Sequence, residues 1–153
     1  MNKPSKMPKM ILFDYGQTLV NEERFDGVSG TEAVMKYAVE NKHNKTPQQV
    51  WEYAGEINRQ IGRFNPDKID LFQYEITSTS FNAYLYESLG INLSVTYEQA
   101  GEIFWDAAAP GKPANGIEHL LEFLKIKGIR IGVVSNLSYS GKALAKRINM
   151  LIP

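Results

Sequence analysis

The sequence predicts an α/β protein in which a core with parallel strands carries an inserted bundle of helices. Two short apolar runs, 10–13 and 129–134, are each followed by polar, turn-forming residues, as buried parallel strands are. Between them, 21–109 has apolar residues at steps of three and four, the spacing of amphipathic helices. A linker rich in Pro and Gly, 110–113, ends this segment. The expected organisation is core 1–20, helical insert 21–109 and core 110–153.

The composition fits one globular domain, or one domain with an inserted lobe. The chain has 153 residues, of which 43% are hydrophobic and 22% are charged, so it can bury a core without crosslinks. Its 17 basic and 17 acidic side chains give a formal net charge of zero, which argues against a nucleic-acid partner and a polybasic membrane anchor. The chain has no cysteine, which excludes disulfides, zinc thiolates and a Cys nucleophile.

The sequence also indicates where the protein works. No apolar run reaches the length of a membrane-spanning helix. The N-terminal tail carries Lys3, Lys6 and Lys9 without the apolar region of a signal peptide. We therefore expect a cytoplasmic protein that does not contact membranes.

The expected insert is a small antiparallel bundle of four helices joined by short polar segments. The first helix covers about 31–42. The other three each begin at a capping residue that has Gln three positions further on. These starts are Thr46, Asp70 and Thr96, and Gly90 ends the helix that begins at Asp70.

The segment after the linker predicts a helix, a strand and a second helix. Asn115 and Glu118 are expected to cap the first helix, which ends at Gly128. The strand covers 129–134, and Ser140 begins the last helix.

Polar groups follow both predicted strands of the core. Asp14 ends the first strand, and Gly16 permits a tight turn directly after it. Ser135 and Asn136 follow the second strand. Ligands of open α/β sheets bind at the carboxyl ends of the strands. A carboxylate there can attack phosphorus or carbon, and hydroxyl and amide groups can hold a phosphoryl oxygen.

Together these segments resemble the haloacid dehalogenase-like (HAD) hydrolase superfamily. The first motif of that family is a strand ending in Asp-x-Asp-x-Thr, which Asp14-Tyr15-Gly16-Gln17-Thr18 resembles. Its second motif is a strand ending in Ser or Thr, which Ser135-Asn136 resembles. The insert is similar to the helical cap that the family carries between these motifs, and the remainder is similar to part of its Rossmann-type core. The resemblance covers nearly the whole chain.

The resemblance implies a magnesium-dependent hydrolase that acts on a small phosphorylated metabolite through an aspartyl-phosphate. It implies that Asp14 is the nucleophile and, together with the backbone carbonyl of Gly16, a Mg²⁺ ligand. Thr18 would support the motif loop. Ser135 would hydrogen-bond the transferred phosphoryl group, and Asn136 would shape the pocket beside it.

Two departures from the family pattern change these expectations. Gly16 stands where phosphatases of the family have a second Asp, which acts as general acid and base. The family also has a Lys and an acidic pair beyond its second motif, whereas no Asp or Glu follows Ser135 here, and neither Lys142 nor Lys146 is matched to that Lys. We therefore expect the chain to be truncated after the second motif and inactive by itself. We also expect an open sheet edge that recruits a second copy, is covered by the chain's own helix, or lowers solubility.

Two other functions remain open. In a 2-haloacid dehalogenase the Asp attacks carbon and needs neither a metal nor a second acid, which agrees with Gly16. Arg24, Arg59 and Arg63 are the candidates for the arginine that would hold its substrate carboxylate. A non-catalytic HAD domain that binds a phosphorylated ligand or a protein agrees with both departures.

A shared active site and a helical cap each make one structural demand. A nucleophile and a phosphoryl-binding group must reach one atom, so the two strands should be parallel neighbours with Asp14 and Ser135 at the same edge. The insert should contain helices and no sheet.

Overall fold

The chain is a mixed α/β protein. A computed structural model describes residues 7–63 and 75–152, which form six helices and three two-stranded sheets. Within this described part of the chain, no helix has the length and apolar character needed to cross a membrane.

The described elements form two compact units. The first unit takes residues 1–22, 111–136 and 146–153, and the second takes 23–110 and 137–145. Each unit therefore contains segments that are far apart in the sequence.

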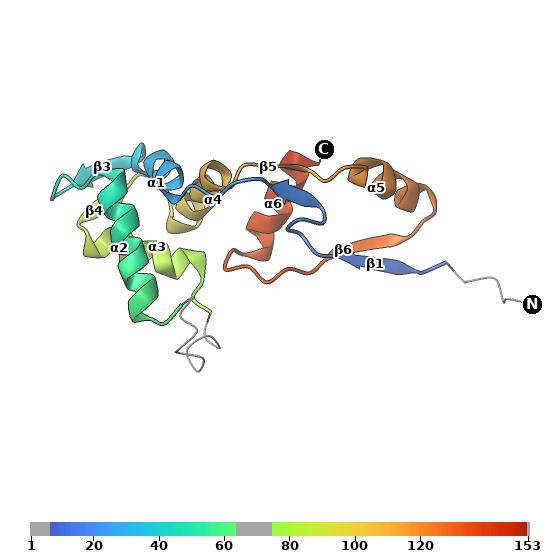
Figure 1. Cartoon of the computed structure of the whole chain (residues 1–153), viewed down its shortest axis with the longest axis horizontal. Helices are drawn as coiled ribbons and strands as arrows, with labels where there is room; N and C mark the ends of the chain where they lie inside the picture. Colours follow the sequence, from blue (N-terminus) through green and yellow to red (C-terminus); the bar gives the residue numbers. More distant parts are fainter. Residues whose placement is uncertain (1–6, 64–74, 153) are drawn as a thin grey trace, which may run out of the picture. The chain divides into compact units, whose positions relative to one another are not determined.

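The first unit contains the parallel strand pair that the sequence predicts. Strand β1 (Met10–Phe13) pairs in parallel with β6 (Arg130–Val133), and the two lie side by side in Figure 1. The register places Phe13 opposite Val133, and the Val134 N–H donates to the Phe13 carbonyl at 2.9 Å. The expectation of parallel neighbouring strands is confirmed.

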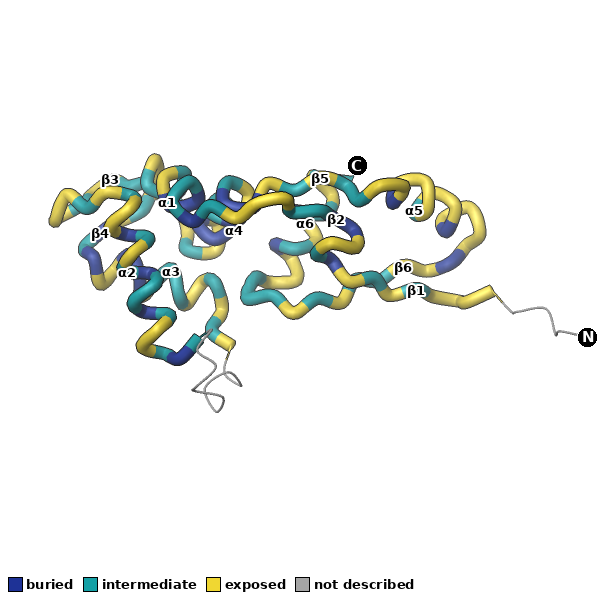
Figure 2. The backbone as a smooth tube through the Cα atoms, viewed as in Figure 1, coloured by how far each residue is buried: buried dark blue, intermediate teal, exposed yellow. Residues whose placement is uncertain are grey.

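One face of this sheet is open. The pleat places Met10, Leu12 and Val134 on the same face, where they are 43%, 60% and 63% exposed. Both strands are exposed or half-buried along their length (Figure 2). Parallel sheets are normally covered on both faces, so this apolar face is unusual for a strand pair of its kind.

Helix α5 (Ile117–Ile126) precedes β6 and buries Ile117 and Leu124. Its N-cap is Gly116, which has φ +77° and makes no side-chain capping bond. The expectation that Asn115 caps this helix is therefore wrong, because a left-handed backbone conformation that suits glycine makes the turn instead. Gly128, with φ +65°, follows the C-cap as expected.

The expected linker is a strand in the structure. Strand β5 (Gly111–Pro113) pairs antiparallel with β2 (Val20–Glu22), so that Val20 lies opposite Pro113. A Cβ at Gly111 would lie 2.6 Å from the Val20 side chain, so the strands approach closely because this residue has no side chain. Pro113 is tolerated because both strands of this two-stranded sheet are edge strands.

Helix α6 (Gly141–Leu151) begins where the sequence predicts. The Ser140 hydroxyl accepts the Ala143 N–H at 3.1 Å, which satisfies one of the free donors of the first turn. The helix contributes its first residues to the second unit and its last residues to the first.

The second unit is built on four helices around one apolar core. They are α1 (Gly27–Met35), α2 (Pro47–Gln60), α3 (Ser78–Ser88) and α4 (Tyr97–Ala108). The core residues are fully or nearly buried, and those larger than alanine are Val34, Val50, Ile57, Leu85, Tyr86, Leu89 and Ile91. The capping boxes predicted at Thr46 and Thr96 are both present.

The second unit is not entirely helical, which corrects the expectation for the insert. Strand β3 (Ala38–Asn41) pairs antiparallel with β4 (Ile91–Leu93). In place of the helix expected over about 31–42, α1 begins four residues sooner, at Gly27, and ends at Met35, and residues 38–41 pair with β4. Asp26 caps α1 by accepting the N–H groups of residues 28 and 29. A bond from the Ser29 hydroxyl lowers the pKa of the Asp26 carboxyl.

The helix start expected at Asp70 with Gln73 lies outside the described residues. In the described part, α3 begins after Thr77, whose hydroxyl accepts the Ser80 N–H at 3.2 Å. Gly90, with φ +63°, follows the C-cap of α3, as the sequence predicts.

Candidate active site

Asp14 and Ser135 follow the carboxyl ends of neighbouring parallel strands. Asp14 comes directly after Phe13, and Ser135 follows Val134, the last residue that bonds to β1. Asp14 is exposed and Ser135 is half-buried, so solvent reaches this edge of the sheet. Asn136 comes next and is exposed. The structure therefore places these three sequence-predicted residues at one edge of one sheet.

The loop after Asp14 is a compact turn organised by backbone bonds. The Tyr15 carbonyl accepts the N–H groups of Leu19 at 3.0 Å and Val20 at 3.2 Å. The Tyr15 N–H donates to Asp14 Oδ1 at 2.8 Å, which orients the carboxylate at the strand end. Thr18 is exposed, and its N–H lies 3.4 Å from the same carbonyl, so its backbone is part of the turn.

The left-handed residue of this turn is Gln17, with φ +58°. The tight turn expected at Gly16 is present, but it does not depend on a left-handed glycine. Gly16 is not among the glycines with positive φ, and a Cβ built on it meets no atom within 4 Å. A side chain at position 16 is therefore sterically acceptable. The backbone of the turn does not require glycine at position 16. The lack of an acid there is therefore a chemical difference from the HAD motif and not a steric one.

A buried polar network holds the residue next to Asp14. Arg147, only 4% exposed, donates from Nε to the Tyr15 hydroxyl at 2.7 Å and from Nη2 to Glu22 Oε1 at 3.1 Å. The Tyr15 hydroxyl donates to the same carboxylate at 3.1 Å. Burial raises the pKa of Tyr15 to about 12, although the nearby Arg147 opposes this shift. The phenol is therefore neutral at physiological pH and fixes the turn as a hydrogen-bonding group.

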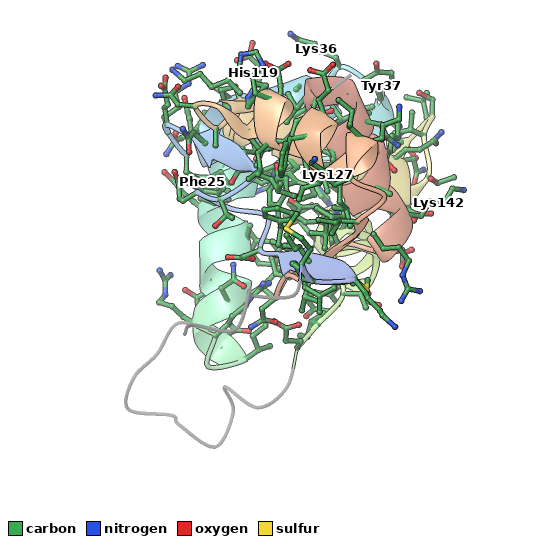
Figure 3. All side chains as sticks on the ribbon, turned by 90° about the vertical axis from the view of Figure 1, so that its right-hand side faces the viewer. Phe25, Lys36, Tyr37, His119, Lys127 and Lys142 are labelled. Carbon is green, nitrogen blue, oxygen red and sulfur yellow. The ribbon has the colours of Figure 1, made fainter. Side chains whose placement is uncertain are left out.

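The pattern of the sequence alone does not reveal this network. Arg147 lies three positions after Leu144 and four positions before Leu151, so the three residues share a face of α6. A cation in the middle of an apolar stripe is the sequence feature that could have indicated a buried arginine. Lys142, in contrast, is exposed at the start of the same helix and projects outward in Figure 3.

The residues expected to hold magnesium form an incomplete set. Asp14 supplies a carboxylate, and Gly16 supplies a backbone carbonyl. In the described ranges, no three or more His, Asp or Glu side chains gather in a way that could hold a metal ion. Magnesium takes near-octahedral oxygen coordination, in which waters and substrate phosphate usually complete a set of one or two carboxylates, so Asp14 and Gly16 supply only part of a site. We therefore derive the chemistry of the site from Asp14, Ser135 and the turn alone.

Two of the three arginines considered for a substrate carboxylate lie together. Arg59 and Arg63 line a cavity of the second unit, whereas Arg24 is not among its lining residues. Arg59 also forms an ion pair with Glu56 one helical turn earlier. This cavity is built entirely from residues of the second unit.

Comparison with known proteins adds no family to this description. The chain matches no protein-family model and no curated protein.

Proposed function

We propose that this chain is a HAD-like domain whose nucleophile is Asp14 and whose substrate is a small phosphate ester. One observation carries the proposal. The parallel pairing of β1 with β6 puts a carboxylate and a hydroxyl, Asp14 and Ser135, just beyond the same ends of neighbouring strands. This is the edge where open α/β sheets bind ligands.

The proposed reaction has two steps. An Asp14 carboxylate oxygen attacks phosphorus, the bond from phosphorus to the ester oxygen breaks, and the alkoxide takes a proton from water. Water then attacks phosphorus of the aspartyl-phosphate, which releases phosphate and regenerates the Asp14 carboxylate. The Ser135 hydroxyl donates to a phosphoryl oxygen, and Asn136 shapes the adjacent surface.

Gly16 limits this chemistry. It offers no side chain to protonate the leaving group or to deprotonate the attacking water. General acid and base catalysis contributes about 10²–10⁴-fold, so we expect turnover of alkyl phosphates by this chain to be very slow or undetectable.

The same residue favours a second candidate, a 2-haloacid dehalogenase. There an Asp14 oxygen attacks the carbon that carries the halogen, and halide leaves without a proton. Water then attacks the carbonyl carbon of the resulting ester, which releases the hydroxy acid and a proton. This route needs no acid at position 16.

The two reactions can be distinguished by incubation in water labelled with a heavy isotope of oxygen. The purified chain is incubated in it with magnesium ions and either an aryl phosphate or 2-chloropropionate. Attack at phosphorus puts the label in released phosphate and leaves Asp14 unlabelled. Attack at the ester carbon puts the label in the Asp14 carboxylate, which peptide mass analysis detects.

Two variants control this experiment. Asp14→Asn should abolish either reaction. Glu118→Gln, an equivalent change at an exposed position of the same unit, should leave it intact. Equal turnover by wild type and Asp14→Asn would reject Asp14 as nucleophile. Because turnover is expected to be very slow, the covalent intermediate is decisive. If Asp14 of the wild type carries neither a phosphoryl group nor an ester after incubation, the chain is a non-catalytic domain and the proposal is wrong.

A further inference from the structure

The second unit contains a cavity of about 760 Å³, which the proposed reaction does not use. This volume falls in the range of small-molecule sites. Six aromatic residues line it: Phe25, Trp51, Phe81, Tyr86, Phe104 and Tyr139.

Flat rings already pack against one another in this wall. Trp51 and Phe104 stack with ring centroids 5.9 Å apart and an angle of 26° between their planes. Phe25 packs at a tilt against both, at 5.9 Å and 6.2 Å, yet remains 64% exposed (labelled in Figure 3). A phenyl ring left so exposed at the edge of an aromatic cluster offers a surface on which a flat ligand can pack.

Helix α2 turns one face toward the cavity and keeps space there. Trp51, Gly55 and Asn58 recur at steps of four and three, so they share a face of the helix. Glycine in a helix interior is unfavourable compared with alanine. A Cβ at Gly55 would meet no atom within 4 Å, so this glycine borders open space rather than a close neighbour.

Polar groups on the same wall indicate the ligand's chemistry. The Oδ1 atom of Asn58 is buried and has no hydrogen-bond partner among the described residues. Such an acceptor is stabilised by a donor on a bound molecule. Two cations, Arg59 and Arg63, also line the cavity. Arg59 forms an ion pair with Glu56, but both side chains are exposed to solvent, where ion pairs are weak.

We propose that this cavity binds a flat aromatic molecule that carries an anionic group and a hydrogen-bond donor. The aromatic wall takes the ring system, Asn58 accepts from the donor, and the two arginines bind the anion. The site lies within one unit and does not depend on Asp14.

Two fluorescent probes test this assignment. Anilinonaphthalene sulfonate has a flat apolar body, an N–H donor and an anion, whereas neutral N-phenylnaphthylamine has the same body and donor without the charge. We expect the sulfonate to bind saturably, with one equivalent per chain, and to quench the fluorescence of Trp51. We expect the neutral probe to bind about tenfold more weakly.

Variants of α2 locate the binding site. Gly55→Leu fills the cavity and should weaken both probes by about tenfold or more, while the urea midpoint stays equal or rises because a helix-interior glycine is removed. Glu52→Leu adds the same side chain on the exposed face of α2 and should leave binding unchanged. Unchanged probe affinity in Gly55→Leu would overturn the proposal.

Charge variants test the anion site. Arg59→Met combined with Arg63→Met should weaken the sulfonate about tenfold and leave the neutral probe nearly unaffected. Glu56→Gln should keep or increase sulfonate affinity, because it frees Arg59. Equal affinity for the two probes in wild type, or no saturable binding, would also overturn the assignment. Asp14→Asn should bind both probes like wild type, so this test is independent of the proposed reaction.

Discussion

Replacement of Arg147 by Met should destabilise the turn that carries Asp14. The guanidinium is 4% exposed and bonds both Tyr15 and Glu22, at 2.7 Å and 3.1 Å. Removing one partner of a buried pair costs about 3–5 kcal/mol, because the other charge remains buried. The Glu22 side chain keeps 23% exposure and can be partly hydrated, so we expect the lower end, about 3 kcal/mol.

The assay must report on the first unit alone. Both tryptophans, Trp51 and Trp105, belong to the second unit, so their fluorescence is unsuitable. Hydrogen exchange of peptides that contain β1 is suitable when exchange follows the opening equilibrium. A loss of about 3 kcal/mol corresponds to exchange that is about a hundredfold faster.

Two comparisons make the Arg147 result interpretable. Lys142→Met removes an exposed cation from the same helix and should leave exchange unchanged. Adding Glu22→Gln to Arg147→Met should recover part of the stability, because no unpaired charge is then left in the network. Exchange in Arg147→Met no faster than in Lys142→Met would refute the reasoning, and so would an additive loss in the double variant.

Three further predictions test other parts of the account. Gly16→Asp should raise the rate of hydrolysis of an alkyl phosphate at least about tenfold, because the position accepts a side chain and an acid would protonate the leaving group. Gly16→Asn also fits but is not an acid, so it should show no gain in rate. Burial raises the pKa of Tyr15 to about 12, so its contribution to stability is complete below its usual pKa near 10 and is lost as pH rises toward 12. Alkaline urea titrations should show that slope in wild type, and an equal slope in Tyr15→Phe would contradict it. The open apolar face of β1 and β6 can recruit a second copy of the chain, as the open edge was expected to do. Leu12→Lys places a charge on this face and should therefore reduce self-association in sedimentation equilibrium. Val39→Lys, at a position 70% exposed in the second unit, should not, and identical behaviour of the two variants would reject the face as an interface.

Local signals predicted much of the fold correctly. The capping boxes at Thr46 and Thr96 each depend on residues within one helical turn, so the sequence alone contains the information. The two core strands were recognisable because each is a short apolar run closed by a polar residue, and their parallel pairing followed from the demands of a shared site.

The features that were missed depend on partners far away in the sequence. β3 lacks the alternating exposure of a typical half-buried strand, and only its pairing with β4, some fifty residues on, makes it a strand. The buried state of Arg147 requires Tyr15 and Glu22, which lie at the opposite end of the chain. The glycines at 16 and 116 could not be told apart by type, because only the backbone shows that Gly116 has positive φ.

Covalent trapping of a phosphoryl group shows whether Asp14 is the nucleophile. A nitrophenyl phosphate has a leaving group that needs no proton, so the first step can proceed without an acid at position 16. The second step requires deprotonation of water, and Gly16 supplies no base, so the aspartyl-phosphate should accumulate. Mixing the chain with this ester and magnesium ions, quenching with acid and mapping peptides by mass should locate one phosphate on Asp14 in wild type and none in Asp14→Asn. Phosphate on another residue, or no phosphate on wild type, would contradict the proposed role of Asp14.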